Sequence, residues 1–297
     1  MTKASVARLF TGIAPVVLVA LMIFGRATAG YYGDGLQTLR VIPWSLGGAI
    51  YRGENVDISV NTANARSVDF SPDGTRMYVV GRGTQNVAEY HLIIPWEIRS
   101  AVFLRELKID APVAHGLFFN KENGTDMYVL NRTELLQFRL AVPWDVTMAK
   151  HVRTKTLSCG NTHLRRGHDI HFKADGTRFY VEDRVNQEVY EYTLSEPWNI
   201  ESMSWRFTLD IADRQKAVRG IEIDPSGTRM WLMDTGSNNV LEYDLGAPWS
   251  LESARFNHAM NLDDVSSNTR GITWRPDGLA FYITSTGHQR IYQFMIG

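Results

Sequence analysis

Five copies of a segment of about fifty residues occupy most of the chain, and this repeat constrains the fold more than any other feature. Each copy contains a glycine turn, an aromatic strand and a Pro-Trp step. The turn glycines, spaced by 50, 52, 51 and 51 residues, are Gly74, Gly124, Gly176, Gly227 and Gly278. A fixed period in this range is typical of solenoids and propellers.

The fourth copy shows what one repeat can form. Apolar and polar residues alternate over 220–223, a nearly all-apolar run covers 230–233, and alternation returns over 240–245. These patterns predict strands, and the more polar segment 254–259 predicts an outer edge strand. Four strands in five copies predict an all-β fold, a five-bladed β-propeller of four-stranded antiparallel blades. A parallel β-helix would use shorter coils, and a β-sandwich would not repeat a Pro-Trp corner.

The two ends of the repeat array predict how the ring closes. The last copy stops after its third strand, 291–296, and the missing corner and fourth strand lie at Pro43-Trp44 and 49–59. We therefore expect the N-terminal fourth strand to complete the C-terminal blade. Residues 36–41 overlap the third-strand position, but they lack the aromatic found as Tyr90, Phe138, Tyr192, Tyr243 and Phe294. The expected organisation is a lead-in over 30–42 and a propeller over 43–297.

Residues 1–29 have the pattern of a secretory signal peptide. Lys3 and Arg8 precede an apolar run over 13–24, and Ala27-Thr28-Ala29 provides small residues for cleavage. The rival interpretation is an uncleaved anchor, although the run is shorter than the ~20 residues that span a bilayer. We expect a periplasmic or secreted protein without stable membrane insertion after cleavage. A net charge of −1 does not call for nucleic acid, and one cysteine, Cys159, allows no internal disulfide.

The amino-acid pattern of the repeat is distinctive. It reads D-G-T-[RK]-[MF]-Y-V, followed by E-Y-x-L-x-x-P-W-x-[IL]. This pattern resembles tandem propeller repeats of uncharacterised bacterial and phage proteins, and more distantly it is similar to lactonase-like and YVTN-type propellers. The resemblance covers residues 34–297 and implies the architecture. It implies no activity, because one fold hosts many functions, the lactonase-like relatives usually have seven blades, and no catalytic motif carries over.

Candidate site residues lie eight positions before each turn glycine, allowing one inserted residue in the second copy. They are Arg66, His115, His168, Arg219 and Arg270. We expect them to form a cationic ring at one mouth of the central channel, with Asp169, Asp183, Arg184 and Asp234 at its rim. This cup would bind a small anion or an acidic segment of a partner protein. Alternatively, the ring is paired internally with carboxylates, for which Asp69, Asp183, Glu222 and Asp234 are candidates. The opposite face, with the turns and Pro-Trp corners, is expected to be scaffold.

A second hypothesis makes the same site that of a hydrolase or lyase acting on a lactone or sugar derivative. His115 or His168 would be the general base, and a hydrogen bond from such a histidine to a carboxylate beside a pocket would support it. No close pair has the spacing of a metal motif, and strand geometry is expected to put His168 and His171 on opposite faces. The sequence therefore predicts no metal and no cofactor.

Overall fold

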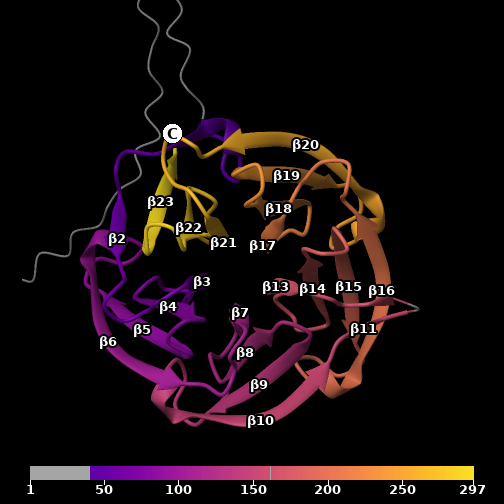
Figure 1. Cartoon of the computed structure of the whole chain (residues 1–297), viewed down its shortest axis with the longest axis horizontal. Helices are drawn as coiled ribbons and strands as arrows, with labels where there is room; N and C mark the ends of the chain where they lie inside the picture. Colours follow the sequence, from indigo (N-terminus) through magenta and orange to yellow (C-terminus); the bar gives the residue numbers. More distant parts are fainter. Residues whose placement is uncertain (1–40, 161) are drawn as a thin grey trace, which may run out of the picture. The chain divides into compact units, whose positions relative to one another are not determined.

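The computed structural model describes residues 41–160 and 162–297, which fold into five antiparallel sheets arranged around an axis (Figure 1). The first blade comprises β3 (Ala65–Phe70), β4 (Arg76–Gly81), β5 (Asn86–Leu92) and β6 (Ala101–Lys108). The second comprises β7 (Ala114–Phe119), β8 (Asp126–Asn131), β9 (Glu134–Leu140) and β10 (Ala149–Thr156). A two-stranded hairpin, β11 (Ser158–Cys159) and β12 (Thr162–His163), follows.

The remaining blades repeat this order. The third comprises β13 (Gly167–Phe172), β14 (Arg178–Asp183), β15 (Glu188–Leu194) and β16 (Met203–Asp210). The fourth comprises β17 (Val218–Ile223), β18 (Arg229–Asp234), β19 (Asn239–Leu245) and β20 (Ala254–Asn261). The fifth comprises β21 (Thr269–Trp274), β22 (Ala280–Ser285) and β23 (Arg290–Ile296), with β1 (Ala49–Ile50) and β2 (Asn55–Asp57) outside them. Short 3-10 turns precede the outer strands at Leu46–Gly48, Ile98–Ser100, Val146–Met148, Ile200–Ser202 and Leu251–Ser253. The five-bladed prediction is confirmed.

Both ends of the propeller meet in the fifth blade. Strand β23 pairs with β22 on one side and with β1 and β2 on the other, through Ala49 opposite Ile296 and Asn55 opposite Tyr292. The C-terminal segment is therefore the third strand and the N-terminal segment the fourth, as the array predicts. The predicted signal peptide, and the lead-in as far as residue 40, lie outside the described residues. Within the described ranges, no helix is long and apolar enough to cross a membrane.

The repeated turn and the repeated Pro-Trp corner form one packing unit. Gly176 has φ +68°, and a Cβ on it would lie 2.5 Å from the ring of Trp198. The Trp198 amide also donates to the Gly176 carbonyl oxygen at 3.0 Å. The other four glycine–tryptophan pairs repeat both features. Since a side chain at the glycine would displace the indole, each copy keeps both halves of the motif.

Hydrogen bonds across each seam explain the aromatic residue in the second strand. The Tyr128 hydroxyl donates to the carbonyl oxygen of Trp198 in the next blade at 2.6 Å, and Tyr78 and Tyr180 make the equivalent bonds. Tyr282 of the fifth blade donates to Trp96 of the first at 2.8 Å, which closes the ring of seams. In the fourth blade, where Trp231 replaces tyrosine, Arg229 donates to the Trp44 carbonyl oxygen at 2.7 Å.

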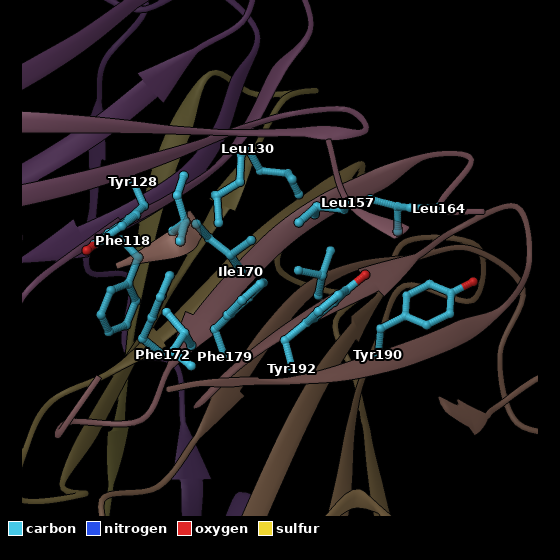
Figure 2. Packing of buried hydrophobic residues seen from close by; sticks show 14 of the residues in the cluster. Phe118, Tyr128, Leu130, Leu157, Leu164, Ile170, Phe172, Phe179, Tyr190 and Tyr192 are labelled. Atoms are coloured by element: carbon cyan, nitrogen blue, oxygen red, sulfur yellow. The ribbon is translucent and has the colours of Figure 1, made fainter. Parts of the chain in front are cut away.

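Aromatic packing fills the space between blades. Figure 2 shows the cluster between the second and third blades, in which Phe118 and Tyr128 meet Phe172. Phe172 lies 4.4 Å from Tyr128 between ring centroids, and Phe179 stacks on Tyr192 at 4.6 Å. Because packed interiors deform little, this core holds the innermost strands β3, β7, β13, β17 and β21 in fixed positions around the axis (Figure 1).

Candidate functional site

Each innermost strand carries a bulge at its beginning. The pairing register shifts between Ala65 and Ser67 in β3, and between Gly167 and Ile170 in β13, and equivalent shifts occur in β7, β17 and β21. A bulge frees residues from the ladder and re-aims their side chains. All five candidate ring residues lie in these bulges. The expectation that His168 and His171 lie on opposite faces is wrong, because the bulge between them turns both rings toward the second blade. His168 contacts His115 there, and His171 contacts Phe118.

The structure brings four of the five ring side chains together from different blades, namely Arg66, His115, His168 and Arg270. The imidazoles of His115 and His168 stack with centroids 4.0 Å apart and planes inclined by 16°. Burial, reinforced by the charges of Arg270 and Arg82, lowers the pKa of Arg66 to about 10. Burial together with the charges of Arg184 and Arg82 lowers the pKa of Arg270 to about 10. Arg66 and Arg270 therefore lie close enough to the loop residues Arg82 and Arg184 to feel their charge.

Both histidines are neutral at pH 7. Burial first, and the charge of Arg66 second, lower the pKa of His115 to about 3. Burial and the neighbouring His115 lower the pKa of His168 further. The neutral His115 ring donates from Nδ1 to the Gly167 carbonyl oxygen at 3.1 Å, so its Nε2 carries a lone pair. A ligand anion at Nε2 would therefore bring a proton with it.

Every ring residue keeps a buried nitrogen that has no hydrogen-bond partner among the described residues. These atoms are Arg66 Nε, His115 Nε2, His168 Nε2, Arg219 Nε and Arg270 Nη1. Buried polar groups normally have partners, and unpaired buried charge is costly. Five such atoms therefore lie in one repeat frame, three on arginines and two on histidines.

The four carboxylates proposed as internal partners are engaged elsewhere. Asp183 accepts the Arg166 amide at 3.2 Å, and Asp234 accepts the Ala217 amide at 2.6 Å. Asp69 accepts from Lys121 and from the Phe119 amide. Glu222 faces His171, with Oε2 3.2 Å from Nδ1. Within the described ranges, no ion pair includes a ring side chain. Asp183 and Asp234 thus hold the rim loops by their backbone amides.

A tightly packed layer closes the cup below the ring. Asp169 stands where the other copies have serine or glycine, and it interacts with the Ser67 side chain of the first blade and the Ile221 amide of the fourth. The fourth blade is next to the third, whereas the second blade separates the first from it, so the interaction with Ser67 reaches past a neighbouring blade (Figure 1). A Cβ on Gly116 would lie 2.9 Å from the Asp169 Cα, and one on Gly271 would lie 2.7 Å from the Ser67 Cα.

Sequence reasoning missed Glu182, which lies beside this layer. Its Oε2 accepts the His168 amide at 3.1 Å, and its Oε1 has no partner among the described residues. Burial, together with the neighbouring Asp169, raises the pKa of Glu182 well above its usual range. Burial likewise raises the pKa of Asp169. The available signal was a charged residue in a second strand whose other copies have Val80, Leu130, Met233 and Thr284.

The face expected to be scaffold also has a site-like feature. A cavity of about 240 Å³ opens at the far ends of the innermost strands, and His171 and Glu222 line it. The histidine–carboxylate bond beside a pocket therefore occurs at this mouth, and neither His115 nor His168 makes one among the described residues. No group of three or more His, Cys, Asp or Glu in the described part of the chain could hold a metal ion.

Comparisons with known proteins are limited to the fold. No family model matches the sequence, and no curated protein matches it. A Desulfotomaculum acetoxidans protein of unknown function aligns with TM-score 0.44 and 9% identity, over 75% of this chain and 63% of its own. A Cps50 (Swd1) β-propeller domain of Myceliophteria thermophila aligns with TM-score 0.49 and 7% identity, over 78% and 83%. A provisionally named 6-phosphogluconolactonase of Bacteroides fragilis aligns with TM-score 0.44 and 17% identity, over 66% and 55%.

The chain thus spans less than two thirds of the length of the first and third of these structures. At identities of 7–17%, these alignments say nothing about the function of this chain. The case for a function therefore depends on the residues of this chain.

Proposed function

We propose that this protein is an exported β-propeller binding module whose cationic ring holds a small anion. The observation that carries the proposal is the set of five buried ring nitrogens, three of them on arginines, that have no partner within residues 41–160 and 162–297. Arg66 and Arg270 supply permanent charge, and their lowered pKa values reflect burial and repulsion by neighbouring arginines. A carboxylate or phosphate group between them would relieve both effects and take charge-assisted hydrogen bonds.

The layer at Asp169 favours a compact ligand. Because the cup ends there, a bound group enters from the ring side and cannot pass along the axis. A small free anion and an acidic side chain of a partner protein present the same carboxylate to the ring. Rigid inner strands keep the guanidinium groups in place before binding, which favours affinity.

Isothermal titration calorimetry with phosphate, sulfate, citrate and a short poly-glutamate peptide tests this proposal on the purified protein. We expect one of these anions to bind, and Arg270→Gln to weaken that binding about tenfold or more, as for a lost charged hydrogen bond. The matched control is Arg255→Gln, an exposed arginine on the outer strand β20. Binding of the peptide alone would identify an acidic partner segment. Equal affinity in both variants, or no binding by any anion, would refute the site.

The hydrolase or lyase hypothesis receives less support at this mouth. A general base works best when its pKa lies near the operating pH, and the pKa of His115 is about 3. His115 bonds to a backbone carbonyl oxygen, and no carboxylate among the described residues orients it. We therefore keep binding as the proposed function of the ring.

A further inference from the structure

The cavity at the mouth opposite the ring is built from one residue of each blade. Counting five positions before each turn glycine, or six in the second copy, gives Asp69, Phe118, His171, Glu222 and Thr273, and all five line the cavity. The ring residues occupy the beginnings of the same strands. The layer at Asp169 lies between the two sets, so this cavity is distinct from the anion site.

The walls of the cavity are aromatic. They include Trp44, Trp96, Trp249, Trp274, Phe70 and Phe118. Trp249 stacks on the His171 ring at 6.2 Å between centroids, and Phe118 meets the same ring edge-on at 5.4 Å. The tryptophans therefore do more than pack on the turn glycines, since their remaining surface encloses the cavity.

The charged groups in the cavity already have partners. Lys121 donates to Asp69 and to the Phe70 carbonyl oxygen, and its Nζ lies 5.4 Å from the centre of the Phe118 ring. On the other side, Glu222 faces His171. Because Lys121 and Glu222 each already bond to a neighbouring side chain, a ligand ion of either sign would have to displace an existing interaction. The chemistry of the cavity therefore suits an uncharged ligand.

Hydrogen-bonding capacity remains for such a ligand. In the described part of the chain, the Thr273 hydroxyl makes no hydrogen bond, although this residue is 7% exposed. The Lys121 ammonium and the Glu222 carboxylate keep side-chain exposures of 30% and 16%. The cavity lining thus combines donors and acceptors with aromatic walls.

We propose that this cavity binds one neutral sugar ring. A pyranose has an apolar C–H face that packs on an indole, and a polar edge of hydroxyl groups that both donate and accept. At about 30 Å³ per water, the cavity holds about eight waters, which suits a single ring. Pockets for larger ligands usually measure about 300–1,000 Å³.

Tryptophan fluorescence of the purified protein, titrated with methyl glucopyranoside, methyl galactopyranoside and N-acetylglucosamine, tests the proposal. We expect at least one of these sugars to change the emission in a saturable way. Thr273→Val should weaken that binding about three- to tenfold, and Glu222→Gln about tenfold or more. Arg270→Gln should change sugar affinity by less than about twofold, because that residue lies at the other mouth. A failed sugar experiment would therefore leave the proposed anion site untouched.

Tetramethylammonium and cyclohexanol serve as competing probes. Tighter binding of tetramethylammonium than of every sugar would mean an aromatic cage for cations and would overturn the proposal. Tighter binding of cyclohexanol, no saturable response to any sugar, or sugar affinity unchanged in both cavity variants would also overturn it. If Glu222→Gln fails to fold, Thr273→Val decides the question, because the valine is isosteric and removes a hydroxyl that bonds to no described residue.

Discussion

Arg270 illustrates how a residue can serve binding at the expense of stability. Arg270 is 8% exposed. Its Nε donates to Thr286 Oγ1 at 3.2 Å, and its Nη1 has no partner among the described residues. Replacing a buried, poorly compensated charge by an apolar group of similar size is often stabilising. The same change removes a cation from the proposed anion site.

We therefore expect Arg270→Met to raise the free energy of unfolding by about 1–2 kcal/mol in buffer without a binding anion. The same variant should lose the stabilisation that a saturating anion gives to the wild type. Urea unfolding with and without the anion measures both effects. Destabilisation of more than about 1 kcal/mol in anion-free buffer would mean that Arg270 is a structural residue.

The two stacked histidines predict a pH dependence. The folded protein holds His115 with a pKa of about 3, whereas an unfolded histidine titrates near 6.5, and the pKa of His168 is also lowered. Below pH 6.5 these two histidines bind more protons in the unfolded state, so their contribution to stability falls as the pH decreases, while the raised pKa values of Asp169 and Glu182 act in the opposite direction. Between pH 7 and 5 the pair should cost roughly 2–4 kcal/mol.

Urea unfolding at pH 7, 6 and 5 measures this loss. The double variant His115→Gln, His168→Gln should lack this loss, so its stability relative to the wild type should increase by roughly 2–4 kcal/mol between pH 7 and 5. The same pH dependence in both proteins would contradict the assignment. Because a bound anion favours the protonated imidazole, we also expect anion affinity to increase as the pH decreases from 7 to 5.

At the scale of the element, the glycine turn and the Pro-Trp corner stabilise a blade only when both are present. Gly176→Ala would force a left-handed backbone on alanine and press a methyl group into the Trp198 indole. We expect a loss of about 2–4 kcal/mol in the free energy of unfolding, from backbone strain and overpacking combined. Gly246→Ala is the matched control, because the heavy atom nearest to a Cβ on Gly246 would lie 3.7 Å from it, at ordinary contact distance.

Urea unfolding of both variants measures the difference. Similar losses in the two proteins would mean that the contact between glycine and indole does not govern the motif. A large loss confined to Gly176→Ala would explain why every glycine turn in this sequence has a Pro-Trp step as its partner.

Sequence reasoning reached different depths for different features of these elements. The period, the glycine turns and the aromatic strands predict the blades, because they are local and recur five times. The ring residue Arg66 can be located by counting within the repeat, because residues at the same position of each copy lie at the same height along the channel. The contact between His171 and Glu222 joins different blades, and the bulges that aim these side chains leave no mark on the residue pattern.

At the scale of the whole molecule, the polar layers along the axis follow from the same symmetry. Each innermost strand contributes one residue to the ring, one to the packed layer and one to the cavity. Asp169 at the packed layer and Glu182 beside it are the residues that break the repeat most clearly. A molecule with two mouths of unlike chemistry can therefore arise from one strand pattern, by substitutions at three positions of each copy.

Closure of the ring is also a property of the whole molecule, and it depends on a short segment. Strands β1 and β2 contribute only two and three residues, yet they cover the β23 edge, while Leu46 is 2% exposed in the core and Trp44 packs on Gly278. A chain that starts at residue 60 would lose these contacts and expose β23 as an unpaired edge strand. Exposed edges pair with other chains.

We expect the chain that starts at residue 60 to be less stable by several kcal/mol than a chain that starts at residue 41, from the buried apolar surface that it lacks. It should also self-associate, because the β23 edge can pair with a second copy. Size-exclusion chromatography and urea unfolding of the two chains measure both effects. If the shorter chain stays monomeric with equal stability, the fifth blade does not need its N-terminal strand, and three strands with the seam bond from Tyr282 to Trp96 are enough to close the propeller.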